Sequence, residues 1–268
     1  MRFKKFAPLW MVLGLVIVAT GCATLRALKA RDQLNKGVAA YRDAQFQTAI
    51  EFFKNAVQLD PTLLNARLYL ATAYAQQYVP GGDSPENVKI GNQAVQAFED
   101  VLNLDAKNTT ALASIAQIYY NMKDFDKAKD FQRHRMQVEP NNPEPYYWIG
   151  VIDWAICFKR DGEMRNDLNL TVPDKHGILP PLPEKSRAKL EEANSQLIDE
   201  GLEALNKSLS LKPNDFNTMA YLNLLYRQKA DIEKSKEARA ADLKMADGWQ
   251  EKAMALRKAV PPQKGTEG

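Results

Sequence analysis

The stretch MQVEPNN at residues 136–142 has three relatives elsewhere in the chain. They are AVQLDPT at 56–62, VLNLDAK at 101–107 and SLSLKPN at 208–214. In each stretch, apolar residues at helical spacing lead into a turn residue, and these turn residues are Pro61, Ala106, Pro140 and Pro213. They are separated by 45, 34 and 73 residues, so the middle interval defines a period and the outer two exceed it by 11 and 39. The sequence therefore predicts an internal repeat with two insertions.

Small and apolar residues recur at fixed places inside each unit. Ala49, Phe53 and Ala56 precede Pro61 at the same spacing at which Ala94, Phe98 and Val101 precede Ala106. Gly37 lies twelve residues before Ala49, and Ala116 lies twelve residues before Ala128. Such small residues let two helices approach closely, and a proline ends the second helix. Each unit is therefore predicted to be a pair of helices.

This pattern resembles the tetratricopeptide repeat (TPR) over residues 30–246, as five units that begin near Ala30, Leu64, Thr109, Pro143 and Phe216. The resemblance implies an all-α, right-handed α-solenoid of about five helix pairs. Insertions at about 78–92 and 158–195 fall between the paired helices of the second and fourth repeats. Trp249, Ala253 and Leu256 share one helical stripe, so residues 247–260 are predicted to form a capping helix. Residues 261–268 are expected to be a disordered tail.

The first 22 residues, MRFKKFAPLWMVLGLVIVATGC, have a basic head, an apolar run from Phe6 to Ala19, and a cysteine. The run is short for a membrane span and typical of a secretory signal. Its end resembles a bacterial lipobox, although Ala19 stands where that family usually has leucine. The resemblance implies a signal peptide at 1–21, a lipidated Cys22, and a short tether at 22–29. An uncleaved signal anchor is the alternative, and in both cases the body is exported and tethered to a membrane.

Charge and cysteine content exclude other classes of protein. Arg2, Lys4 and Lys5 account for the whole excess of 36 basic over 33 acidic residues, so we expect no nucleic-acid partner. If Cys22 carries lipid, Cys157 has no disulfide partner, and a buried, inert thiol is the simplest interpretation. Ala23 lacks the aspartate that retains many lipoproteins at the inner membrane, which favours the outer membrane, facing the periplasm.

Catalytic patterns are absent from the sequence. It has two histidines, His134 and His176, and neither a G-x-S-x-G elbow nor a glycine-rich phosphate loop. We therefore expect no enzyme activity, no cofactor and no metal. The alternative is an enzyme or small-ligand site built by the 158–195 insertion, which would require Asp174, His176 and Cys157 to converge.

A binding surface is the remaining hypothesis. In TPR proteins the first helix of each pair lines a concave groove. By position, the inward residues here are Asn65, Gln117, Tyr120, Asn121, Glu144, Tyr147, Trp154, Asn217, Asn223 and Arg227. Amides and aromatic rings suit an extended peptide. Some TPR proteins bind a C-terminal carboxylate through a clamp of basic residues. At two positions of that clamp this chain has Leu34 and Val38, so the clamp is not matched.

The resulting hypothesis is a lipid-anchored scaffold that binds proteins or peptides of the bacterial envelope during assembly of an envelope complex. We expect the 158–195 insertion to fold over the edge of the groove, with a helix from Glu184 to Glu192. A solvated inner face without a fixed ligand is the alternative interpretation of the groove residues.

Overall fold

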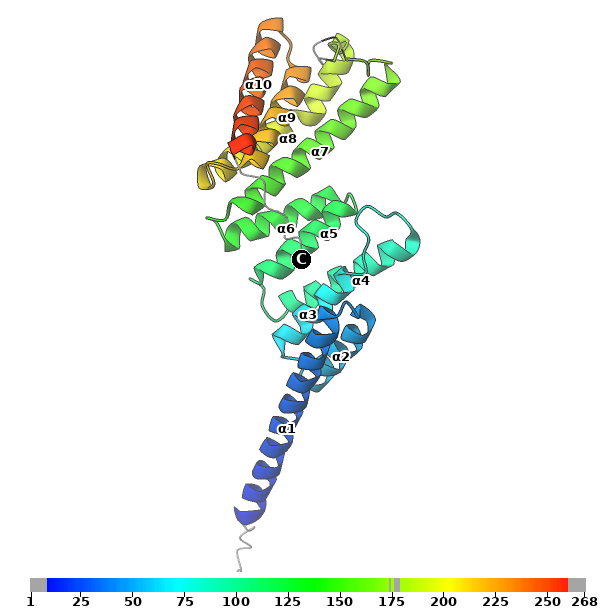
Figure 1. The fold of residues 1–268 in the computed structure, drawn as a ribbon, viewed down its shortest axis with the longest axis vertical. Helices are drawn as coiled ribbons and strands as arrows, with labels where there is room; N and C mark the ends of the chain where they lie inside the picture. Colours follow the sequence, from blue (N-terminus) through cyan, green and yellow to red (C-terminus); the bar gives the residue numbers. More distant parts are fainter. Residues whose placement is uncertain (1–8, 174, 176–178, 260–268) are drawn as a thin grey trace, which may run out of the picture. The chain divides into compact units, whose positions relative to one another are not determined.

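The computed structural model describes residues 9–173, 175 and 179–259, with side chains from Thr24 onward. Within these residues all regular structure is α-helical and comprises ten helices (Figure 1). The chain divides into two compact units, Met1–Met122 and Lys123–Gly268. The predicted all-α class and the number of helix pairs are confirmed.

Unit 1 contains the first five helices: α1 (Leu9–Arg42), α2 (Phe46–Leu59), α3 (Leu64–Ala75), α4 (Pro85–Leu102) and α5 (Thr109–Asn121). α3 contacts both α1 and α2. Phe53 is fully buried, and its ring lies against Gly37 so closely that no Cβ would fit there. The spacing of small residues that predicted close helix pairs therefore reflects a ring of one helix packed on the backbone of the other.

Unit 2 contains α6 (Phe125–Val138), α7 (Pro143–Asp167), α8 (Glu184–Leu211), α9 (Phe216–Ile232) and α10 (Lys236–Ala259). α9 contacts both α7 and α8. The repeat prolines Pro140 and Pro213 lie between helices, after α6 and after α8. Pro143 occupies the first turn of α7, where its missing N–H costs nothing, and Asn142 caps this helix. Leu190, Leu205, Leu222 and Leu225 form the centre of the core of this unit.

The second insertion was predicted as a separate segment between two helices, and the structure differs from this prediction. α7 continues through Phe158 to Asp167 and α8 begins at Glu184, so most of residues 158–195 lengthens the paired helices. The predicted helix from Glu184 is confirmed. Asp161 and Arg165 of this extension are buried and pair with each other, which lets a polar helix pack on the core.

The other predicted boundaries also shift. Residues 85–92 of the first insertion belong to α4, and Asn87 closes the preceding loop through hydrogen bonds with Val79 N, Val79 O and Gly82 O, each at 2.8 Å. α10 runs unbroken through Gly248, so residues 247–259 continue the second helix of the fifth repeat rather than form a separate capping helix. The predicted tail at 261–268 lies outside the described residues.

α1 also crosses a predicted boundary. It is one helix from Leu9 to Arg42, and residues 22–29, the expected tether, are part of it. Leu25 and Leu28 are exposed, whereas Ala30 is fully buried. In the described part of the chain no helix is long and apolar enough to span a membrane.

Among the buried ionic networks of unit 2, one is centred on Arg165 and a second on Lys129. Arg165 of α7 has 2% of its surface exposed, and its Nε donates to Asp161 Oδ2 at 2.8 Å while its Nη2 lies 3.0 Å from Asp231 Oδ1 of α9. Its Nη1 also donates to the carbonyl oxygen of Pro180 at 2.9 Å. One guanidinium therefore joins α7, α9 and the segment that leads into α8.

The second network joins three helices through Lys129 of α6. Its Nζ donates to Asp153 of α7 at 2.5 Å and to Glu200 of α8 at 2.9 Å. Asp153 is fully buried, and its Oδ2 has no hydrogen-bond partner among the described residues. Burial raises the pKa of Asp153 to about 7, against the lowering effect of Lys129.

Two glycines of α7 give a matched stability test. A Cβ on Gly150 would collide with the side chain of Leu205, whereas a Cβ on Gly162 would meet no atom within 4 Å. We expect Gly150→Ala to lower the free energy of unfolding by about 1–3 kcal/mol through overpacking. We expect Gly162→Ala to raise it by about 0.5–1 kcal/mol, because alanine costs less helix-forming entropy. Urea unfolding of both variants measures the difference, and two changes of the same sign would contradict the packing described for α7.

Candidate partner-binding surface

The predicted groove residues of unit 1 lie on two helices. Asn65 is exposed on α3, and Gln117, Tyr120 and Asn121 are half-buried near the end of α5. Gln117 Nε2 donates to Asn121 Oδ1 at 3.2 Å. The two amides of α5 are therefore held to each other, with the remaining donor and acceptor of each side chain available to a backbone.

In unit 2, an aromatic row runs along α7 and α9. The centroid of the Tyr147 ring lies 5.6 Å from that of Tyr221, in an edge-to-face arrangement. The Trp154 ring contacts Tyr221 in the same way, with centroids 5.4 Å apart. Trp154 stacks on Phe158 at 5.1 Å, and Phe158 is 55% exposed. Tyr147 and Trp154 are half-buried and pack against the core of this unit, so they contribute to its packing. Their role in binding stays a prediction.

A small concavity, the α7–α9 hollow, lies beside this row. It has a volume of about 170 Å³, and Glu144, Tyr147 and Asn217 are among its lining residues. Glu144 is held by Arg135, whose Nη2 donates to Glu144 Oε2 at 2.8 Å. Three of the predicted groove residues thus meet at one concavity.

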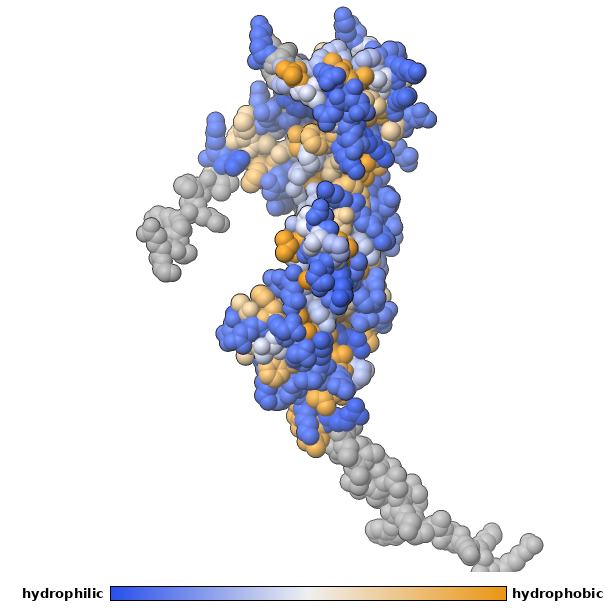
Figure 2. Space-filling view, turned by 90° about the vertical axis from the view of Figure 1, so that its right-hand side faces the viewer, coloured by the Kyte–Doolittle hydropathy of each residue, from blue (hydrophilic) through white to orange (hydrophobic). Residues whose placement is uncertain are grey.

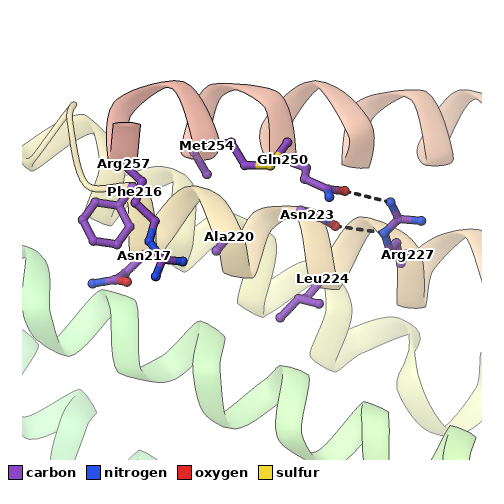
Figure 3. A pocket seen from close by; sticks show the side chains of 10 residues that line it. Phe216, Asn217, Ala220, Asn223, Leu224, Arg227, Gln250, Met254 and Arg257 are labelled. Atoms are coloured by element: carbon purple, nitrogen blue, oxygen red, sulfur yellow. Dashed lines mark hydrogen bonds between the residues drawn. The ribbon is translucent and has the colours of Figure 1, made fainter. Parts of the chain in front are cut away.

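A larger concavity, the α9–α10 groove, has a volume of about 530 Å³ and is lined by ten residues, of which Asn217, Asn223 and Arg227 were predicted (Figure 3). Arg227 Nε donates to Asn223 Oδ1 at 2.9 Å. Its Nη2 donates to Asp247 Oδ1 at 2.8 Å and to Gln250 Oε1 at 3.2 Å. These bonds fix the guanidinium at one end of the groove. Because Asn217 lines both concavities, they adjoin each other.

Sequence reasoning missed the α10 side of this groove. Four residues of α10 line it: Gln250, Ala253, Met254 and Arg257. The predicted boundary before residue 247 placed these side chains on a separate capping helix. Their spacing of three and four residues was the available signal, since it puts them on one face of a helix that faces α9. The face of the molecule seen in Figure 2 is mostly hydrophilic, with smaller hydrophobic patches.

The alternative site in the 158–195 insertion gains no support from its described residues. Cys157 is fully buried in the core of unit 2, and burial raises the pKa of its thiol to about 12, so it is a weak nucleophile. Asp174 and His176 lie outside the described residues. No group of three or more metal-ligating side chains occurs in the part of the chain that the structure describes.

Comparison with known proteins supports the repeat architecture. Residues 109–142 match the family model of the tetratricopeptide repeat. Interferon-induced protein with tetratricopeptide repeats 2 of Cricetulus griseus is 23% identical over 180 residues, which cover 67% of this chain. The chain spans only 31% of the length of that relative.

Several solved structures share the fold at low sequence identity. MamA matches with a TM-score of 0.55 and 15% identity, over 87% of this chain and 98% of that one. MamA 41-end from Desulfovibrio magneticus RS-1 matches with a TM-score of 0.55 and 16% identity, over 86% and 96%. YrrB, described as a TPR protein with an unusual peptide-binding site, matches with a TM-score of 0.51 and 14% identity, over 84% and 90%. The chain therefore has the all-α fold of TPR solenoid proteins, and its residues 109–142 match the repeat of that family.

Proposed function

We propose that the protein is a membrane-anchored TPR scaffold, without catalytic activity, that binds other envelope proteins or peptides. The observation that carries this proposal is the convergence of predicted residues in unit 2. Glu144, Tyr147 and Asn217 line the α7–α9 hollow, and Asn217 joins it to the groove that holds Asn223 and Arg227. A concave surface that combines aromatic rings, amides and fixed charges suits a polypeptide, because amides pair with its backbone and rings cover its side chains.

The fold supports the same class of function. TPR proteins bind protein or peptide partners, and one structural neighbour is described by its peptide-binding site. The adaptor role in assembly of an envelope complex, at the outer membrane and facing the periplasm, rests on the signal-like N-terminus with Cys22.

A steric block at Asn217 tests the binding surface. Asn217 is exposed and lines both concavities, so Asn217→Trp fills them without disturbing the core. We expect the partner that co-purifies with the wild type from detergent-solubilised envelopes to bind the variant about 30-fold more weakly, which corresponds to about 2 kcal/mol. Quantitative mass spectrometry of the captured partner, followed by titration, measures this loss.

Asn214→Trp is the matched control, because Asn214 is also exposed, three residues away, and lines neither concavity. Equal capture by the wild type and both variants would contradict the proposal. Tyr147→Ala with Trp154→Ala is a poorer test, since both rings pack on Tyr221 and their loss lowers stability as well as binding.

The anchor is tested by metabolic labelling with a fatty-acid analogue. We expect wild-type protein and Cys157→Ser to be labelled equally, and Cys22→Ser to lose the label entirely. Cys157 is the matched control because it is the second cysteine of the chain and is buried. Label retained on the Cys22 variant would rule out lipidation at this residue and leave the uncleaved anchor.

A further inference from the structure

We propose that the α9–α10 groove binds an α-helix of a partner protein, one whose apolar stripe is flanked by acidic side chains. The inference deepens the proposed function, because it assumes a protein partner and names the structure that the partner presents. It rests on the packing rule of this chain, on the shape of the groove and on its charge.

The packing rule, seen once in each of the two compact units, is that a helix pair receives the first helix of the next pair. α3 contacts both α1 and α2 in unit 1, and α9 contacts both α7 and α8 in unit 2. The same face of the α9–α10 pair receives no further helix among the described residues, and the groove lies on it. A helix is therefore the form of ligand that this surface is built to accept.

The register of ring contacts places the groove at that face. Trp154 is the twelfth residue of α7, and its ring lies 5.4 Å from Tyr221, the sixth residue of α9. In unit 1, Tyr41 is the twelfth residue counted from Ala30, and its ring lies 6.4 Å from Tyr69, the sixth residue of α3. In both compact units, the twelfth residue of the first helix of a pair therefore faces the first helix of the next pair.

In α9 the twelfth residue is Arg227. The fifth residue is Ala220, which corresponds to Tyr147 of α7, another residue in ring contact with Tyr221. Both Arg227 and Ala220 line the α9–α10 groove. The groove thus lies where a following first helix would pack.

The shape of the groove suits a helix. Ala220 of α9 and Ala253 of α10 are small residues that let a third helix approach both backbones. Leu224 and Met254 supply apolar contact, and Met254 is 47% exposed. From Phe216 to Arg227 the groove follows α9 for about three turns, which is the length over which a short amphipathic helix makes its contacts.

The charge of the groove selects the partner. Its charged lining residues are Arg227 and Arg257, and no carboxylate lines it. The two arginines lie at opposite ends (Figure 3). Arg227 is fixed by Asn223, Asp247 and Gln250, whereas Arg257 makes no ion pair or hydrogen bond with another described residue. Acidic side chains beside the apolar stripe of an incoming helix would pair with both guanidiniums, and basic ones would be repelled.

The test uses two fluorescein-labelled 18-residue peptides of helix-forming sequence, each with a Leu/Ala stripe flanked either by glutamates or by lysines. Anisotropy titrations use the full chain in detergent. We expect the glutamate peptide to bind at least about tenfold more tightly than the lysine peptide. We expect Arg257→Glu and Met254→Asp each to weaken the glutamate peptide by about tenfold or more. Lys258→Glu, a neighbouring exposed cation outside the groove, should leave its affinity within about twofold.

Other outcomes would overturn the inference. Equal affinity for the two peptides, no binding of either, or equal effects of Arg257→Glu and Lys258→Glu would each do so. A dimer in analytical ultracentrifugation that Met254→Asp dissociates would show that a second copy occupies the groove. A chain truncated after Ala259 that binds the glutamate peptide about tenfold more tightly would show that residues 260–268 occupy it. The Asn217→Trp experiment measures capture of the natural partner rather than binding of these peptides, so the partner can depend on Asn217 even where the peptides fail. Failure of the inference and failure of the proposed function are therefore distinguishable.

Discussion

Replacing Arg165 by alanine is expected to lower the free energy of unfolding of unit 2 by about 3–5 kcal/mol. The guanidinium has 2% of its surface exposed and lies between Asp161 and Asp231. Burial raises the pKa of both carboxyl groups, and the charge of Arg165 opposes that rise. Without the arginine, two partly desolvated carboxyl groups face each other across a cavity, and the carbonyl of Pro180 loses its donor. Each of these consequences destabilises the folded state.

Tryptophan fluorescence during urea unfolding measures this effect, because Trp148, Trp154 and Trp249 all belong to unit 2. Lys159→Ala is the control on the same helix, since Lys159 is exposed and pairs with Glu163 only at 3.9 Å. We expect it to cost less than about 1 kcal/mol. A loss from Arg165→Ala no larger than that of the control would show that the buried network contributes nothing specific.

The second prediction concerns pH. Unit 2 is expected to be more stable at pH 5 than at pH 8, and Asp153 is expected to supply about 3 kcal/mol of that difference. Burial raises the pKa of Asp153 from its ordinary 3.8 to about 7, so the folded state binds this proton more tightly than the unfolded state does. The resulting stability is fully present below the unfolded pKa and is lost as the pH rises through the folded one. Lys129, Glu200 and Arg133 are the charged groups that act on Asp153.

The measurement is urea unfolding at intervals from pH 5 to pH 8 on three proteins. Asp153→Asn should flatten the pH dependence, because asparagine takes up no proton, whatever its effect on absolute stability. Asp130→Asn, on the exposed side of α6, should leave the slope unchanged. Parallel curves for wild type and Asp153→Asn would show that this carboxyl group keeps an ordinary pKa in the folded state.

The helix pairs were predictable because prolines and small residues follow the repeat. Gly37, Phe53 and Pro61 occupy the positions at which the structure has a close helix contact, a buried ring and a helix end. Hydrophobic periodicity carries this information directly. The family resemblance supplied the positions of Asn217, Asn223 and Arg227, which the structure brings to one groove.

The remaining features depend on contacts that a sequence pattern does not encode. The extension of α7 was missed because Asp161 and Arg165 look like solvent-exposed residues until each buries the charge of the other. The continuity of α10 was missed because glycine often ends a helix, and Gly248 stands at this point. A Cβ at Gly248 would meet no atom within 4 Å. The contacts of Tyr147 and Trp154 with Tyr221 were not predicted, because nothing in the sequence indicates that this ring lies against both of them.

α1 gives the proposed anchor a mechanical property. Residues 22–30 are helical, so the body begins roughly 12 Å from the anchored residue at the end of a stiff rod, at 1.5 Å per residue. A flexible linker would let the repeats search a hemisphere, whereas a helix keeps their distance and tilt from the membrane nearly constant. Partners in the same membrane that extend to this distance then encounter the binding surface at a raised effective concentration. Partners that do not extend so far rarely encounter it. In the proposed anchored state, the rod therefore restricts which partners can reach the binding surface before any side chain contacts them.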